Sequence, residues 1–269
     1  MPQRVDLFDN TYQNFNARVL DAIRKETFGT DIGQNSWLTV DEYERLLPWL
    51  NLSSESHVLE VASGSGGPSL YLARTIGCRV TGIDANESGV ATATAMAEKA
   101  GATAQVQFRI ANADAALPFE ADSFDALLCI DSMNHFPNRL SVFCEWQRLL
   151  RPGGRALFTD PVVITGPVTN DELALRSLVG LFLFVPPGVN EDFINQAGFH
   201  LVRQEDVTSN AALVSGRWHK ARQAHKEDLL RIEGEERFAG LQQFFKAVHD
   251  LTSEKRLSRI AYLAEKRAS

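Results

Sequence analysis

Residues 57–161 alternate between two patterns of hydrophobic and polar positions. Short apolar runs predict buried strands at 57–62, 79–84, 104–111, 124–130 and 155–160. Between them, apolar residues three or four positions apart predict helices at 68–76, 87–100 and 138–150. Strands separated by helices in this order predict an α/β fold built on a doubly wound, mostly parallel sheet.

The N-terminal segment has helical patterns of its own. Its apolar residues recur at alternating steps of four and three positions: Phe8, Tyr12, Phe15, Val19 and Ile23. This stripe predicts one amphipathic helix over 5–28, ended by Gly29. The capping-box sequence from Thr39 to Glu42 predicts a second helix. We therefore expect residues 1–56 to form a helical cap in front of an α/β domain over 57–269.

The C-terminal part adds helices to the sheet domain. A Leu- and Phe-rich stretch, 170–185, has a helical pattern and ends at two prolines and a glycine. A short helix at 190–197 and strands at 199–207 and 258–265 follow. The additions lie at about 166–197 and 211–250, and the second is charged and helical. We expect it to form either a lid or the surface of a homodimer.

Composition narrows the class of protein. The chain has 269 residues, of which 44% are hydrophobic, so one large domain with a full core is expected. The net charge of -7, without a Lys/Arg cluster, argues against nucleic acid as a partner. The start lacks an apolar signal segment, and the longest apolar run, 178–185, is too short to span a bilayer. We therefore expect a cytoplasmic protein without membrane binding, in which Cys78, Cys129 and Cys144 are buried, reduced thiols.

A glycine-rich turn carries the clearest chemical signal. The strand ending near Val61 runs into a turn that holds Gly64, Gly66 and Gly67, and an acid, Asp84, ends the next strand. Strand, glycine turn, helix, strand and acid in this order are typical of a site for an adenosine group.

Two residues favour S-adenosylmethionine over a nicotinamide dinucleotide at this site. Ser69 occupies the position of the third glycine in the dinucleotide fingerprint. Glu60 would repel phosphates, but it can accept hydrogen bonds from the ammonium group of S-adenosylmethionine. Asp84 is then placed to accept both ribose hydroxyls.

With these residues the chain resembles the class I S-adenosylmethionine-dependent methyltransferases. Their first motif, acid-x-Gly-x-Gly-x-Gly, appears here from Glu60 to Gly66, with Ala62 in place of the first glycine. The segments 112–114, 117–131 and 149–160 are similar to the later motifs of the family, in the same order. Residues 57–161 are most similar to the small-molecule branch, which includes ubiquinone/menaquinone C-methyltransferases and glycine and phosphoethanolamine N-methyltransferases.

The resemblance implies a Rossmann-like sheet of seven strands whose last two strands pair antiparallel, with S-adenosyl-L-methionine as the cofactor. It also implies that 112–114 meets the adenine and that the polar loop 31–37 closes over the methionine end. An acid beside a glycine turn buries an uncompensated charge unless a ligand is bound. We expect the cofactor site to contain Ser36, Glu60, Gly64, Ser65, Gly66, Asp84, Ala85, Ala113, Asp114 and Ile130.

The acceptor is expected beyond the carboxyl ends of strands 124–130 and 155–160, next to Asp131, Ser132, Asn134, His135 and Asp160. His135 is the candidate base, or else the anchor of a turn. Asp131 either binds an acceptor amine or caps a helix. Pro161 replaces the Asn that follows the second acid in magnesium-dependent catechol O-methyltransferases, so no metal is expected.

Aromatic residues in the additions offer a second acceptor feature. Tyr12, Trp37, Trp218 and His219 either surround an acceptor or pack in the core. Phe182 and Phe184 either line an apolar acceptor pocket or fill the core.

The pattern as a whole predicts methyl transfer to a small-molecule acceptor by in-line displacement, with N, O or C as the nucleophile. The alternatives are an NAD(P)-dependent oxidoreductase and a non-catalytic protein that binds S-adenosylmethionine.

Overall fold

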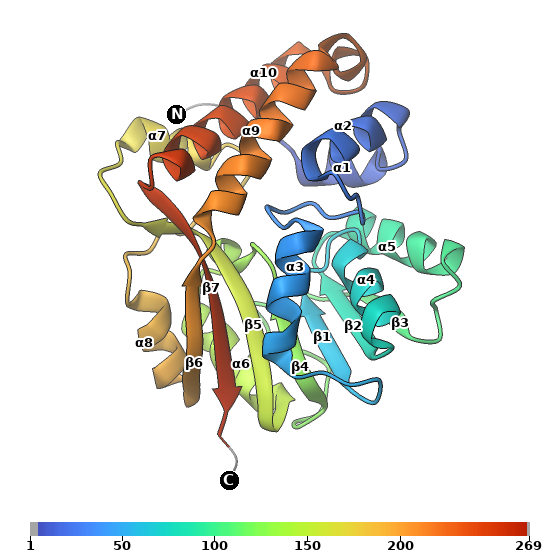
Figure 1. The fold of residues 1–269 in the computed structure, drawn as a ribbon, viewed down its shortest axis with the longest axis vertical. Helices are drawn as coiled ribbons and strands as arrows, with labels where there is room; N and C mark the ends of the chain where they lie inside the picture. Colours follow the sequence, from blue (N-terminus) through green and yellow to red (C-terminus); the bar gives the residue numbers. More distant parts are fainter. Residues whose placement is uncertain (1–4, 268–269) are drawn as a thin grey trace.

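A seven-stranded sheet runs through the centre of the computed structural model, which describes residues 5–267 (Figure 1). Its strand order is β3-β2-β1-β4-β5-β7-β6. The strands are β1 (His57–Val61), β2 (Arg79–Asp84), β3 (Val106–Ile110), β4 (Phe124–Cys129), β5 (Leu150–Ile164), β6 (Phe199–Asp206) and β7 (Leu257–Lys266). Only β7 runs antiparallel to its neighbours, β5 and β6. The predicted mostly parallel sheet with an antiparallel final pair is confirmed.

Helices cover both faces of the sheet and the carboxyl ends of its strands (Figure 1). In chain order they are α1 (Phe8–Gln13), α2 (Arg18–Phe28), α3 (Val40–Leu46), η1 (Leu47–Leu50), α4 (Gly67–Ile76), α5 (Glu87–Lys99), η2 (Met133–His135), α6 (Arg139–Leu149), α7 (Asn170–Arg176), α8 (Val189–Gln196), α9 (Thr208–Ala224) and α10 (Lys226–Ser253). Within residues 5–267, none of these helices combines the length and the apolar character needed to cross a bilayer.

The central strands are buried on both faces, which explains their nearly continuous apolar sequences. On one face, Leu59 and Val61 of β1 pack in a cluster with Trp146 of α6. On the other face, Val58 packs in a cluster with residues of α3 and α4, including Leu72. A third cluster lies above the carboxyl ends of the strands, where α1, α2, α9 and α10 meet.

The predicted helix over 5–28 is wrong in its continuity, because the chain breaks between α1 and α2. The Asn14 side chain donates to the carbonyl of Asn10 at 3.0 Å. Arg24 donates from Nη1 to the carbonyl of Phe15 at 2.9 Å, and its guanidinium carbon lies 4.0 Å from the centre of the Phe15 ring. Contacts to a distant side chain thus replace the hydrogen bonds of a continuous helix.

The predicted helix over 170–185 ends early, at Arg176. After it, Leu183 N donates to the carbonyl of Asn134 at 2.8 Å, and Val185 forms a bridge with Val163 of β5. The second half of the segment is therefore a loop held by other elements. The structure also corrects the expectation for the thiols, since Cys78 and Cys129 are buried but Cys144 is exposed.

Candidate active site

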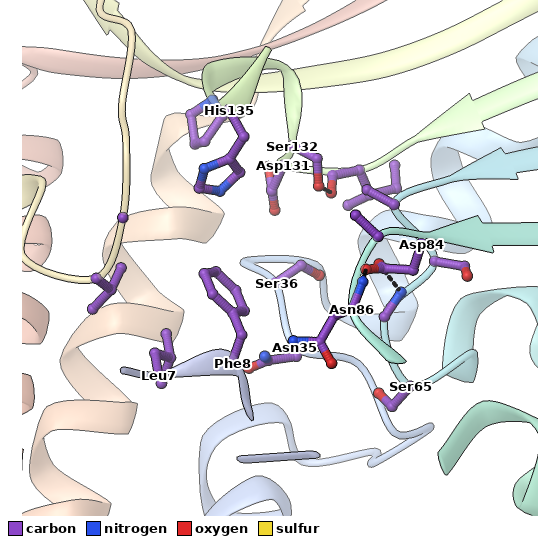
Figure 2. A pocket seen from close by; sticks show the side chains of 18 of the residues that line it. Leu7, Phe8, Asn35, Ser36, Ser65, Asp84, Asn86, Asp131, Ser132 and His135 are labelled. Atoms are coloured by element: carbon purple, nitrogen blue, oxygen red, sulfur yellow. Dashed lines mark hydrogen bonds between the residues drawn. The ribbon is translucent and has the colours of Figure 1, made fainter. Parts of the chain in front are cut away.

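A cavity of about 440 Å³ lies between the carboxyl ends of the strands and the helices above them (Figure 2). The cofactor residues predicted from sequence that line it are Ser36, Glu60, Gly64, Ser65, Asp84, Ala85, Ala113, Asp114 and Ile130. The predicted catalytic residues Asp131 and His135 also line it. The topology therefore brings these residues, which come from five separate segments of the chain, to one place.

Gly66 is the one predicted cofactor residue that does not line this cavity. It precedes α4 in the left-handed region, with φ of 78°. A Cβ at Gly66 would lie 2.4 Å from Cζ of Phe108 and 2.8 Å from Cβ of Ala93. Gly66 is therefore required for the close packing of the turn against β3 and α5, and its expected contact with the cofactor stays a prediction.

The glycine turn also contains a strained residue. Ala62, at the place of the family's first glycine, lines the cavity and has φ of 57°. A left-handed backbone disfavours any residue with a Cβ, so the turn is held in this shape by its surroundings. Tyr12 is part of them, because a Cβ at Gly64 would lie 2.5 Å from its hydroxyl oxygen.

Glu60 ends β1 as a nearly completely buried acid, with 2% of its surface exposed. Its Oε2 accepts a hydrogen bond from the hydroxyl of Ser69. Burial raises the pKa of Glu60 to about 8, since a carboxylate loses its hydration there. The hydroxyl of Ser63, also in the cavity wall, has no partner among residues 5–267. This end of the cavity is therefore prepared for a polar, positively charged group.

Asp84 ends β2 and connects two turns. Its Oδ2 accepts from Gly64 N and its Oδ1 from Asn86 N, both at 2.8 Å (Figure 2). Burial raises the pKa of Asp84, while the backbone donors oppose that shift. A carboxylate has about four lone-pair positions, so two remain for a ligand.

His135 follows β4 and points into the cavity, across from Phe8 (Figure 2). Its Nδ1 lies 2.9 Å from the carbonyl oxygen of Leu181. Because a carbonyl only accepts, Nδ1 carries the proton and the neutral ring has its lone pair on Nε2. Burial lowers the pKa of His135 to about 4. The ring is thus a neutral hydrogen-bond acceptor near pH 7 and a weak base.

The Asp131 carboxylate is occupied by protein donors. Oδ2 accepts from Trp37 N at 2.8 Å, and Oδ1 accepts from the Thr159 hydroxyl at 2.7 Å and from Nε of Arg259 at 2.6 Å. Arg259 is fully buried and also donates from Nη1 to Glu42 at 2.6 Å. These contacts hold the loop 31–37 against β4 and β7.

Two other residues expected beside the acceptor lie outside the cavity lining. Asp160 is fully buried, where it accepts from Nη1 of Arg139 at 2.5 Å and from Nδ2 of Asn190 at 2.8 Å. Asn134, the middle residue of η2, is fully buried and does not line the cavity. Asp160 therefore anchors α6 and α8 to β5, and both expectations are corrected. In the part of the chain from 5 to 267, no group of three or more His, Cys, Asp or Glu residues is arranged to hold a metal ion.

The far end of the cavity has aromatic walls. Of the aromatic residues left open between an acceptor wall and the core, Trp37, Trp218 and Phe182 line the cavity here, and Tyr12 lines it beside the glycine turn, whereas His219 and Phe184 do not line it. Several other residues that line the cavity were not predicted to do so from the sequence: Leu7, Phe8, Asn35, Pro161, Arg176, Val179, Gly180, Phe244 and Phe245. Phe244 and Phe245 belong to the helical stretch expected to form a lid or a dimer surface, and they could have been found had that stretch been placed over the site. Arg176 carried no sequence signal.

Comparisons with known proteins agree with this geometry. Residues 59–158 match the family model described as a methyltransferase domain. Methyltransferase GfsG of Streptomyces halstedii is 36% identical over 137 residues, which are 51% of this chain and 48% of that protein. The 27-O-demethylrifamycin SV methyltransferase of Amycolatopsis mediterranei (strain S699) is 30% identical over 168 residues, 61% of each chain. This chain thus spans about half to three fifths of the length of these curated relatives.

A solved structure shows the same fold. It is Haemonchus contortus phosphoethanolamine N-methyltransferase 2 in complex with phosphomonomethylethanolamine and S-adenosylhomocysteine. The TM-score is 0.80 at 19% identity, and the match covers 100% of this chain and 62% of that one.

Proposed function

This chain belongs to the class I S-adenosylmethionine-dependent methyltransferases, and from that premise we propose that it transfers a methyl group to a small-molecule acceptor. The observation that carries the proposal is the pair of acids on either side of the glycine turn, the buried Glu60 and the partly buried Asp84, in a cavity that continues to an aromatic end. The names of the relatives include N-, O- and C-methyltransferases, so the nucleophile stays open between N, O and C.

The residues of the cavity fit S-adenosyl-L-methionine, the cofactor of the family. Glu60 would hold the amino group, and Asp84 would accept from the ribose hydroxyls through its remaining lone pairs. Ala85, Ala113 and Ile130 would enclose the adenine, with Asp114 at its edge and Ser36 near the methionine end. When bound, the cofactor supplies a methyl group on a sulfonium with a neutral leaving group. The protein then contributes mainly by holding the acceptor in line with that methyl group.

We assign His135 and Asp131 different roles in this reaction. Nε2 of His135 accepts a hydrogen bond from an O–H or N–H of the acceptor and orients its nucleophile, which its neutral state supports. Asp131 mainly positions the loop 31–37 rather than binding the acceptor, since Trp37, Thr159 and Arg259 occupy three of its about four lone-pair positions.

Calorimetric titration with S-adenosylhomocysteine tests the cofactor assignment. We expect binding, and we expect Asp84→Ala to weaken it by about 1–3 kcal/mol through lost hydrogen bonds. Asp206→Ala is a matched control, because Asp206 also ends a strand and accepts from the backbone two residues on, at Thr208 N, outside the cavity. Equal affinity of wild type and Asp84→Ala would contradict the ribose assignment.

A screen of small-molecule acceptors for S-adenosylhomocysteine release tests the reaction itself. Binding of NADH or NADPH instead would support an oxidoreductase. Binding of S-adenosylmethionine without transfer to any acceptor would support a non-catalytic protein.

Three further expectations remain proposals. A cytoplasmic location is supported by the free state of Cys78, Cys129 and Cys144. Of the two readings of residues 211–250, the lid is supported by Trp218, Phe244 and Phe245, which line the cavity; sedimentation or light scattering would test the homodimer. The net charge of -7 supports the exclusion of nucleic acid as a partner.

A further inference from the structure

A buried arginine forms part of the far wall of the cavity. Arg176, the last residue of α7, has 1% of its surface exposed and lines the cavity. Its guanidinium carbon lies 4.5 Å from the ring centre of Phe182, 5.3 Å from that of Phe244 and 5.8 Å from that of Trp37. We call these three rings the aromatic cage.

Arg176 has no acidic partner within residues 5–267. None of its nitrogens makes a recorded hydrogen bond or salt bridge, and Nε and Nη1 are closed off from solvent. The other buried arginines are all paired: Arg24 with Asp31, Arg139 with Asp160, Arg222 with Glu233, and Arg259 with Asp131 and Glu42. The missing partner is therefore specific to the arginine that faces the cavity.

The aromatic cage stabilises this cation only in part. Ring faces attract a positive charge, but they leave the in-plane N–H donors of a guanidinium without acceptors. Burial lowers the pKa of Arg176 to about 9, so the side chain is still charged near pH 7. Burying a cation whose N–H donors have no acceptors destabilises the fold unless an anion binds to it.

We propose that Arg176 binds an anionic group of the acceptor, so that the substrates of this protein are organic acids whose apolar part lies against the aromatic cage. The inference rests on the proposed methyl transfer and adds the class of the acceptor. The planar fork of a guanidinium matches the two oxygens of a carboxylate, and it also binds phosphate.

The position of Arg176 favours the acceptor over the cofactor as its partner. The loop that follows Arg176 contains Leu181, whose carbonyl holds Nδ1 of His135, and Phe182, whose ring centre lies 4.8 Å from that of His135. Arg176 and His135 therefore share one side of the cavity. An acid bound to Arg176 would place the rest of its skeleton beside Nε2 of His135.

The test uses the full chain saturated with S-adenosylhomocysteine. Benzoate and phenyl phosphate are the anionic probes, and benzamide is the neutral probe with nearly the shape of benzoate. Arg176→Met keeps the bulk of the side chain and removes the charge, Arg176→Lys keeps the charge without the fork, and Arg217→Met removes an exposed arginine of α9 as the control. Affinities are measured by calorimetry, and thermal midpoints are measured without ligand.

We expect benzoate or phenyl phosphate to bind wild type and Arg217→Met alike, and at least tenfold more weakly to Arg176→Met. The affinity of Arg176→Lys for the anion should lie between those of wild type and Arg176→Met. Benzamide should bind wild type and all three variants with the same affinity. The anion that binds wild type with the higher affinity shows whether the natural anionic group is a carboxylate or a phosphate. Arg176→Met should melt no lower than wild type, since it removes an unpaired buried charge.

Three results would overturn the proposal while S-adenosylhomocysteine still binds. The first is no binding of either anion to wild type, and the second is equal binding to Arg176→Met. The third is a tenfold loss of S-adenosylhomocysteine affinity in Arg176→Met with anion binding intact, which would assign Arg176 to the cofactor carboxylate. Failure of wild type to bind S-adenosylhomocysteine would instead contradict the cofactor assignment.

Discussion

Three acids near the cavity differ in what they can do because their hydrogen-bond partners differ. Glu60 has one recorded hydroxyl donor and a raised pKa. Asp84 accepts from two backbone amides and keeps lone pairs for a ligand. Asp131 is used by Trp37, Thr159 and Arg259. The residue type alone would have given all three the same role.

Ala62 provides a prediction about stability at the scale of one residue. Ala62→Gly should relieve the left-handed backbone at φ of 57° and raise the free energy of unfolding. After the extra chain entropy of glycine is subtracted, we expect a gain of about 0.5–1 kcal/mol. Urea denaturation of the protein without ligand measures it.

Ala104→Gly is the control for this change, because Ala104 is exposed in a turn and is not among the residues with positive φ. That variant should lose stability by about 0.5 kcal/mol. A loss of similar size in Ala62→Gly would show that the turn is not strained at Ala62.

Among the elements, the loop 31–37 and the loop after α7 shape the cavity more than any helix does. Both are irregular, and both are held by side chains of distant elements, such as Asp131 for Trp37 and His135 for Leu181. Their positions therefore depend on the sheet beneath them. A mutation of Asp131 or His135 should therefore displace the whole loop that the side chain holds and not a single residue of it.

Asp131→Ala tests this view of the loop 31–37. The change leaves Arg259 buried with only Glu42 as its partner, and we expect a loss of unfolding free energy of about 3 kcal/mol. Combining it with Arg259→Met should restore part of the loss, because no uncompensated cation remains. Chemical denaturation of the two single variants and the double variant gives the coupling.

The alternative for Asp131 is direct contact with the acceptor. In that case Asp131→Ala would unfold like wild type and lose only turnover. That outcome would return Asp131 to the catalytic residues.

At the scale of the whole molecule, helices lie above the carboxyl ends of the strands (Figure 1). The cavity is lined by residues of both layers. An ionisable side chain is buried at each end of this cavity, Glu60 at one end and Arg176 at the other, and burial shifts the pKa of both toward the neutral form. The empty protein should therefore be less stable than its core alone would allow, and a ligand that gives both side chains a partner should stabilise the entire fold.

The stability of the empty protein should depend on pH through Glu60. Its pKa in the folded protein, about 8, lies above the value of 4.5 for a free glutamate. Folding therefore favours the protonated form, so this contribution is complete below pH 4.5 and is lost as the pH rises toward 8. The loss amounts to at most about 5 kcal/mol between these limits.

Glu60→Gln has no such titration. We expect its unfolding free energy to fall less than that of wild type between pH 5 and 8, measured by denaturation in a series of buffers. Parallel curves for the two proteins would mean that Glu60 is already ionised in the empty fold.

The sequence by itself determined the sheet, the glycine turn and the acids beside it. These features depend on neighbours along the chain: the strands on continuous apolar runs, and Asp84 on the amide of Asn86, two residues on. The family motifs lie in the same stretch, so most of the residues that line this end of the cavity could be anticipated. Gly66 was the exception, since its role comes from packing against Phe108.

Only the tertiary structure decided the acceptor end. Asp131 and Arg259 are 128 positions apart, and Arg259 and Glu42 are 217 apart, so no local pattern could reveal that they neutralise one another. The end of α7 at Arg176 depends on hydrogen bonds that the following loop makes to η2 and β5. The periodicity of apolar residues shows which side of an element is buried, but it does not show which charged side chain lacks a partner from a distant part of the chain. Only the tertiary structure therefore reveals that Arg176 faces the cavity without an acidic partner within residues 5–267.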